Sequence, residues 1–281
     1  MVYTHQGDDA GRKAGPILLS ELTTLGFQSA MQSVEAVLIP VGAHEQHGPA
    51  LPVSTDTLAA QVLSALTGTL LAPRVAVAPA IPWGVSWHHM DFPGTISLRE
   101  ETLISIVVDT VGSLHRHGVQ RIILVNMHGG NNAALQIAVE RCHRELNVPL
   151  VASIFAYTLI ANAASNVLGD EAIGHAGGDE SSVILAIRPE LVIQDDLGVR
   201  QLDEGVRQAQ ALARAAGGVL PLHQSVTSAT GAVGDSSNAS AEAGATILGE
   251  AANQIRAVIE NLLDLDLRKL RARDGSRSEE S

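Results

Sequence analysis

Aromatic side chains, cysteines and clustered positive charges are all scarce in this sequence of 281 residues. Aromatic residues make up 2% of the chain and hydrophobic residues 46%, so the core must consist of Ala, Val, Leu and Ile. The single cysteine, Cys142, cannot form an intramolecular disulfide, which favours a reducing compartment. The formal net charge of −12 argues against nucleic acid as a partner, because binding phosphate backbones needs clustered Lys and Arg.

Long hydrophobic runs are also absent from the sequence. The first 15 residues, MVYTHQGDDAGRKAG, have no apolar core that could serve as a signal peptide. No later run approaches the roughly 20 apolar residues that a membrane helix needs. We therefore expect a cytoplasmic protein with no membrane partner. We predict a flexible segment at 1–15, a single domain at 16–266 and a disordered tail at 267–281.

Predicted strands and helices alternate along the chain. Strands are predicted at 34–39, 75–80, 121–126, 148–157 and 219–225, and helices at 16–32, 56–71, 100–117, 132–146, 181–188, 201–216 and 240–265. The stretch from 158 to 174, with its Asn, Ser and Gly residues, is expected to be irregular. The alternation predicts an α/β fold, with a parallel or mixed sheet covered on both faces.

A Gly- and Pro-rich loop, IPVGAHEQHGPALPVSTD at residues 39–56, follows the strand at 34–39. Glu45 and His47 are two residues apart, so in an extended segment they point the same way. Asp56 can return to the same place if the Pro-rich segment folds back. A lone Glu-x-His pair is usually just solvated, so this loop needs partners from other elements before it indicates a site.

Two further candidates lie where strands end or helices begin. His128 follows the apolar strand at 121–126, at the strand end where open α/β sheets place their ligands. Glu180 stands at the approach to the helix at 181–188. Two histidines and three carboxylates form a donor set suited to Zn, Mn or Fe rather than to thiolate chemistry. The combination predicts a metal site.

The segment at 81–98, IPWGVSWHHMDFPGTISL, contains both tryptophans and two adjacent histidines. It has too many Gly, Pro and aromatic residues for a regular element, and loops often carry binding groups. We expect it to form part of a substrate pocket through Trp83, Ser86, Trp87, His88 and His89. The alternative for the tryptophans is packing at a contact between subunits.

Four blocks of this sequence resemble the creatininase family, the creatinine amidohydrolases. They are PVGAHEQHGPALPVSTD, WGVSWHHMDFPGTISL, NMHGGNNAAL and HAGGDESSVILAIRPELV, with a weaker similarity in GAVGDSSNASAEAGATIL. The resemblance implies a three-layer α/β/α sandwich with a mainly parallel central sheet. It also implies two divalent metal ions per subunit, Zn or Mn with Fe as the alternative, and hydrolysis of a small-molecule amide. A homo-oligomer, commonly a hexamer, is implied as well.

The resemblance also assigns roles to individual residues. Glu45, His47, Asp56 and His128 match metal ligands, with Asp56 bridging the two ions. His175 matches a histidine that moves protons, and Gly129 and Gly130 offer backbone N–H groups to an oxyanion. In creatininase a metal-binding glutamate occupies the position of Gly130, so Glu180 becomes the substitute fifth ligand and, with His175, a candidate catalytic residue.

Several functions remain open within this resemblance. The principal expectation is an amidohydrolase that cleaves an amide, cyclic amide or formamide C–N bond through a metal-bridged hydroxide. The alternative within the family is a peptidase that trims the mycofactocin precursor peptide. A member that has kept its metal but acts as a non-catalytic scaffold subunit is the third possibility.

Overall fold

The centre of the molecule is a five-stranded parallel sheet. The structure, a computed structural model, describes residues 15–200, 204–216 and 219–270. The strand order is β1-β3-β2-β4-β5, and every adjacent pair is parallel. These strands are β1 (Ile17–Leu18), β2 (Ala36–Val41), β3 (Val75–Val77), β4 (Arg121–Asn126) and β5 (Leu150–Phe155). The predicted α/β class with a mainly parallel sheet is confirmed.

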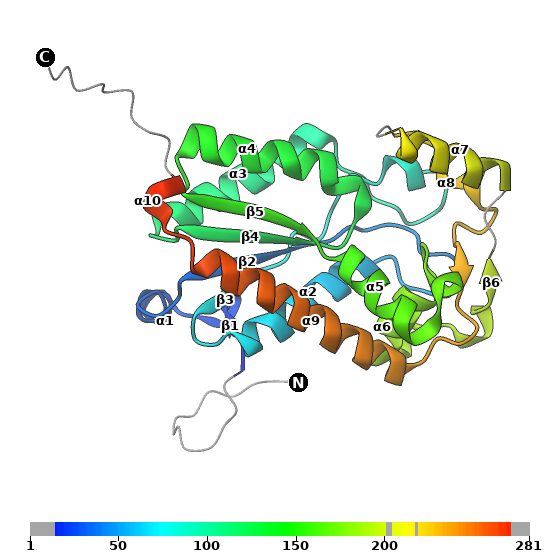
Figure 1. Cartoon of the computed structure of the whole chain (residues 1–281), viewed down its shortest axis with the longest axis horizontal. Coiled ribbons are helices and arrows are strands. Elements are labelled where there is room, and N and C mark those ends of the chain that lie inside the picture. The colour runs from blue at the N-terminus through cyan, green and yellow to red at the C-terminus, as the bar shows by residue number, and fades with distance from the viewer. Residues whose placement is uncertain (1–14, 201–203, 217–218, 271–281) are drawn as a thin grey trace, which may run out of the picture.

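Helices cover both faces of this sheet (Figure 1). Because successive side chains of a strand point to opposite faces, Val37 and Ile39 of β2 pack toward one helical layer, and Ala36 and Leu38 pack toward the other. The first layer consists of α3 (Glu100–Arg116) and α4 (Asn132–Leu146), and the second of α2 (Thr55–Leu70), α5 (Tyr157–Leu168) and α9 (Ala241–Leu263). Burial on both faces explains why the central strands are continuously apolar.

The remaining elements gather mostly beyond the carboxyl ends of the strands, at the right of Figure 1. They include α6 (Gly178–Ile187), α7 (Glu204–Ala215), α8 (Gln224–Thr227) and an antiparallel pair formed by β6 (Val199–Arg200) and β7 (Gly234–Asp235). Short 3-10 turns are η1 (Leu19–Glu21), η2 (Trp87–His89), η3 (Gly129–Asn131), η4 (Asp170–Ala172), η5 (Pro189–Leu191) and η6 (Gln194–Asp196). At the opposite end lie α1 (Thr24–Ala30) and α10 (Leu267–Leu270).

Three expectations for the elements were wrong. The helix predicted at 16–32 is β1, η1 and the shorter α1, because Ile17 pairs with Ala76 at the edge of the sheet. The stretch expected to be irregular contains α5, whose Asn162 and Asn166 are exposed while Ala163 and Ala164 are buried. No strand forms at 219–225. Val219 is 91% exposed, and α8 begins at Gln224.

The first residues assigned to the predicted tail form a short helix. Residues 267–270 form α10, since the Asp266 carboxylate accepts a hydrogen bond from the backbone N–H of Arg268 at 3.1 Å. Residues 1–14, 201–203 and 271–281 fall outside the described chain, so the expectations of a flexible start and a disordered end stay predictions. Within the described residues, no helix is both long enough and apolar enough to cross a membrane.

Candidate metal centre

Five predicted ligands meet at the carboxyl ends of two neighbouring strands. Glu45 and His47 lie in the loop after β2, and His128 lies two residues after the end of the adjacent β4. Asp56 is in the first turn of α2, and Glu180 is in the first turn of α6. All five side chains are buried. Four elements far apart in sequence therefore deliver two histidines and three carboxylates to one place.

Asp56 lies between two groups of donors. Its Oδ1 is 3.4 Å from Nε2 of His47, and its Oδ2 is 3.3 Å from Nδ1 of His128. His47 Nε2 also lies 3.5 Å from Glu180 Oε2, whereas His128 Nδ1 lies 3.2 Å from Glu45 Oε1. The donors thus form a His47–Glu180 half and a His128–Glu45 half, and one oxygen of Asp56 faces each half.

The main chain determines which nitrogen of each histidine faces the carboxylates. His47 Nδ1 is 3.1 Å from the backbone oxygen of Glu45, and His128 Nε2 is 3.0 Å from that of Val85. A carbonyl oxygen only accepts hydrogen bonds, so each of these nitrogens carries the hydrogen. The opposite nitrogen of each ring faces Asp56 and is the one that would bind a metal ion, which is the arrangement of metal-binding histidines.

The donor set fits divalent cations. Glu45 Oε2, His47 Nε2 and Asp56 Oδ2 are buried without a hydrogen-bond partner. Among the ion pairs of the described residues, no Lys or Arg neutralises the three carboxylates. Burying such charges without compensation is costly, and coordination by a metal ion is one way to compensate them. The oxygen and imidazole donors suit Zn or Mn.

The pKa values of these groups reflect the same need for positive charge. Burial by itself lowers the pKa of His47, but Asp56 and Glu180 outweigh it and raise this pKa to about 10. Burial likewise opposes a proton on His128, yet Glu45 and Asp56 hold its pKa well above the usual value. Burial raises the pKa of Glu180 to about 8, against the effect of His47. In the metal-free protein, these raised pKa values favour bound protons on His47, His128 and Glu180.

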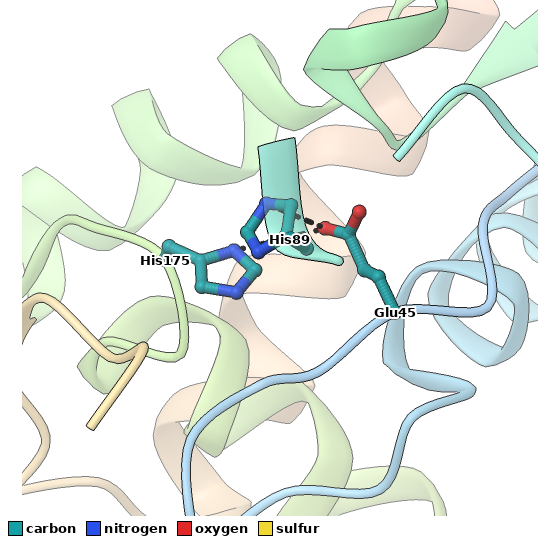
Figure 2. A group of neighbouring side chains, drawn as sticks. All are labelled: Glu45, His89 and His175. Atoms are coloured by element: carbon teal, nitrogen blue, oxygen red, sulfur yellow. Dashed lines mark ion pairs between the residues drawn. The ribbon is translucent and has the colours of Figure 1, made fainter. Parts of the chain in front are cut away.

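Two more histidines approach Glu45 from other segments. Figure 2 shows His89, on η2, and His175, in the loop before α6, directed toward the carboxylate of Glu45. Glu45 Oε1 is 3.5 Å from His89 Nε2 and 3.8 Å from His175 Nδ1. Burial lowers the pKa of His89 to about 2 and that of His175 to about 4. Both rings are therefore neutral at pH 7.

A cleft of about 160 Å³ opens onto the centre. Of the predicted substrate-binding residues, Gly129 lines it, whereas Trp83 and Trp87 do not and are 47% and 65% exposed. Ser86 is fully buried, with its hydroxyl 3.3 Å from Nε2 of His128. The cleft is lined by Glu45, Asp56, Met127, His128, Gly129, Phe155, Tyr157, His175 and Glu180.

Gly130 and His88 occupy the space beside His128. A Cβ atom on Gly130 would lie 2.2 Å from the backbone oxygen of Val85 and 2.4 Å from Nε2 of His128. The ring of His88 stacks on that of His128, at 5.6 Å between centroids and 13° between planes. A glutamate does not fit at position 130 in this backbone arrangement. Glu180 places its carboxylate 3.5 Å from His47 instead.

Two residues near the centre were not predicted as site residues. Gln46 contacts both His89 and His175 through its side chain. Tyr157, on the wall of the cleft, donates a hydrogen bond of 3.0 Å to the buried Asp179. The position of Tyr157 at the end of a predicted strand, in a chain with few aromatic residues, was a signal that could have found it. Gln46 lies between the predicted ligands Glu45 and His47, and this position could have identified it as a site residue.

The fold and the site define a class: an α/β/α sandwich with a candidate divalent-metal centre at the carboxyl end of its parallel sheet. The sequence model described as "Creatininase: Creatinine amidohydrolase" matches residues 20–259. The chain belongs to the creatininase family.

Two relatives illustrate the range of activities in this family. The chain is 32% identical over 240 residues to the mycofactocin precursor peptide peptidase of Mycobacterium ulcerans (strain Agy99). The aligned region covers 83% of this chain and 88% of the relative. It is 29% identical over 201 residues to the creatinine amidohydrolase of Pseudomonas putida. This second aligned region covers 64% of this chain and 75% of the relative.

Solved structures agree on the fold. "Creatininase Mn" superimposes with a TM-score of 0.74 at 24% identity, covering 89% of this chain and all of that one. A mutant creatininase described as "Zn-Zn type" gives a TM-score of 0.73 at 24% identity, covering 90% of this chain and all of that one. The predicted three-layer α/β/α sandwich is confirmed.

Proposed function

We propose that this protein is a metal-dependent amidohydrolase that cleaves a C–N bond using two divalent ions, Zn or Mn. Glu45, His47, Asp56, His128 and Glu180 would hold the ions. The observation that carries the proposal is the position of Asp56, whose two oxygens face two different histidines at 3.4 and 3.3 Å. Support for the metals comes also from the structural neighbours named as Mn and Zn-Zn forms.

Bound divalent ions would polarise the scissile carbonyl and make a nucleophile available from water at neutral pH. His175 supplies the proton transfers. Its Nε2 is 2.7 Å from the backbone oxygen of Gln46 and so carries a hydrogen, which leaves the Nδ1 lone pair facing the cleft. Nδ1 takes a proton from the water as its oxygen bonds to the carbonyl carbon. It returns this proton to the leaving nitrogen as the C–N bond breaks.

The walls of the cleft orient the scissile group. Phe155 and Tyr157 form its apolar side, and the hydrogen bond from Tyr157 to Asp179 fixes the tyrosine ring. A volume of about 160 Å³ suits a small cyclic amide, or the reacting end of a longer molecule. Gly129 lines the cleft beside His128 and is placed to offer its backbone to the developing oxyanion.

The candidate substrates are a small cyclic or formyl amide and a peptide. The peptide is favoured by one observation: the relative that matches 83% of this chain at 32% identity is a peptidase. The exposed Trp83 and Trp87 lie in the segment that carries His89, and they offer apolar surface for a longer chain. These two tryptophans distinguish the candidates, because a small amide held within the cleft does not reach them.

The test uses metal-stripped protein, reloaded with Zn or Mn, and a panel of cyclic amides, formamides and short peptides. We expect turnover of at least one substrate that depends on added metal. A Trp83→Ala, Trp87→Ala double variant should raise KM for a peptide and leave KM for a cyclic amide unchanged. Equal amide hydrolysis by stripped and reloaded protein would refute the metal mechanism. No turnover of any substrate would favour a scaffold subunit.

A further inference from the structure

We propose that Gln46 is a positioning residue that holds His175 and His89 in the same tautomer, with the hydrogen on Nε2, and with different ring nitrogens facing Glu45. Its main-chain carbonyl contacts His175, and its side-chain amide contacts His89. His175 would then present a lone pair, and His89 an N–H group, to the same oxygen of Glu45. The tautomers follow from hydrogen-bond chemistry alone, whereas their use in catalysis rests on the proposed hydrolase function.

The orientation of the Gln46 amide is fixed by two backbone groups. Its Oε1 accepts a hydrogen bond of 2.8 Å from the N–H of Gly48, and its Nε2 donates one of 3.2 Å to the carbonyl of Gly231. Reversing the amide would place a donor against a donor at Gly48 and an acceptor against an acceptor at Gly231. The amide nitrogen therefore faces the histidines.

The tautomer of His89 follows from this orientation. Gln46 Nε2 lies 2.7 Å from His89 Nδ1, and an amide nitrogen can only donate. His89 Nδ1 must accept, so its hydrogen is on Nε2, which lies 3.5 Å from Glu45 Oε1. His89 thus stands beside the centre as a donor. It has no lone pair directed at the centre with which to bind a metal ion, although it lies within ligand distance of Glu45 and His175.

His175 also carries its hydrogen on Nε2, but it faces Glu45 with the other ring nitrogen, Nδ1. Its Nε2 donates to the Gln46 carbonyl at 2.7 Å, so its contact of 3.0 Å with the Gln46 amide nitrogen brings two donors together and is not a hydrogen bond. The two amide hydrogens go instead to His89 and Gly231. His175 Nδ1 keeps a lone pair 3.8 Å from Glu45 Oε1.

The surroundings leave Gln46 little freedom to move. Its side chain is buried. A Cβ atom on Gly231 would lie 2.0 Å from Gln46 Oε1, and Gly231 has a φ of +81°, which favours glycine. The backbone N–H of Gln46 donates to the Thr95 hydroxyl at 3.1 Å. The loop after β2, the 3-10 turn with His89 and the loop with Gly231 are therefore joined through one amide.

The tautomers can be read directly by solid-state NMR of zinc-loaded protein labelled with ¹⁵N-histidine, which works at any oligomeric size. The His89 and His175 signals are assigned by their loss in His89→Gln and His175→Gln. We expect Nδ1 of both residues to give the resonance of an unprotonated nitrogen. A protonated Nδ1 on His89 in the wild-type protein would overturn the proposal, whether or not any amide is hydrolysed.

Gln46→Glu tests the amide itself. A carboxylate opposite His89 Nδ1 can only accept, so this nitrogen should become protonated. The kcat should fall by about 10–100-fold, the usual effect of removing an outer partner of a metal site, while metal content stays unchanged. Gln46→Met removes the donor at similar volume. If Gln46→Glu does not fold, Gln46→Met should still move the His89 Nδ1 resonance toward that of a free lone pair.

Gln224 provides the matched control. Its amide also donates to the Gly231 carbonyl, at 3.0 Å, but has no hydrogen bond with His89 or His175. Gln224→Glu introduces the same charge at the same backbone oxygen and should leave both histidine spectra unchanged. An unchanged His89 spectrum in Gln46→Glu, or an equal change in Gln224→Glu, would refute the role of Gln46.

Discussion

Asp56 connects the two halves of the candidate centre, so its loss should affect both. We expect Asp56→Ala to lose bound metal and activity together, with a fall in activity beyond the ~100-fold typical of outer partners. Elemental analysis of the purified variant and an amide hydrolysis assay measure the two effects. Asp109→Ala, at an exposed position of α3, is the control. Full metal content in Asp56→Ala would contradict the bridging assignment.

His175 should behave differently from Asp56. Its ring moves protons in the proposed mechanism and lies outside the donor set, so His175→Ala should keep its metal. We expect kcat to fall by about 10²–10⁴-fold, the usual contribution of general acid–base catalysis. Parallel metal analysis and steady-state kinetics separate this outcome from simple loss of the centre. A variant that retains wild-type kcat would exclude His175 as the proton carrier.

Metal binding should release protons at neutral pH. The pKa of His47 is raised to about 10 and that of His128 is also raised, so both carry protons near neutral pH in the metal-free protein. Metal binds the unprotonated nitrogens, so the affinity should increase with pH up to about 10. Calorimetric titration with Zn in buffers of different ionisation enthalpy counts the protons. Heats independent of the buffer would contradict this prediction.

At the scale of elements, the contact of α9 with α6 positions Glu180. A Cβ atom on Gly244 of α9 would lie 1.9 Å from the backbone oxygen of Ser182 in α6. Gly244→Ala should lower the free energy of unfolding by roughly 1–3 kcal/mol, as overpacking does, and weaken metal binding. Gly249 is on the same helix with nothing within 4 Å of its added Cβ. Gly249→Ala should therefore stabilise by up to about 1 kcal/mol. Urea unfolding compares the two.

The sequence predicted the elements whose apolar pattern is strong. The continuous run of β4 and the regular face of α3 gave bounds within a residue of those observed, because both are set by burial against neighbours. The helix α5 was missed, since its small residues and asparagines resemble a loop until α9 is seen to cover it. A strand was also predicted at 219–225, but no partner strand lies beside this segment among the described residues.

The site was predictable by residue type and less so by contact. Motif spacing identified Glu45, His47 and Asp56 as candidate ligands. It could not show that the two oxygens of Asp56 face different histidines. The role of Gln46 depends on a carbonyl at residue 231, which is 185 positions away in sequence. Contacts of this kind arise from tertiary structure, and local patterns do not encode them.

For the whole molecule, bound metal should contribute to stability. The ligands come from four separate elements, so the unfolded chain has no comparable site, and metal present at about 100 times its Kd should add about 2.7 kcal/mol to the free energy of unfolding. Chelator treatment should therefore lower Tm, and Zn or Mn should restore it, in a thermal melt followed by circular dichroism. An Mg²⁺ addition controls for ionic strength. A melt unaffected by chelator and metal alike would contradict the fit of the donor set.

We also propose, from the family, that the protein is a cytoplasmic homo-hexamer. A contact between subunits is the alternative to peptide binding for the exposed Trp83 and Trp87. Light scattering coupled to size-exclusion chromatography should give about six times 29.3 kDa. Trp87→Ser should then shift the protein toward smaller species. A monomer at micromolar concentration would exclude the hexamer and leave the two tryptophans to substrate binding.

The wide spacing of the ligands along the chain has a consequence for synthesis in the cell. Glu45 leaves the ribosome first, and Glu180 follows 135 residues later. The helix α9, which packs on α6, comes later still, at Ala241–Leu263. A nascent chain cannot complete the centre until almost all of it has been translated. Under the proposed function, metal would therefore be acquired by a nearly finished protein, and a product terminated before α6 would lack Glu180, one of the five proposed ligands.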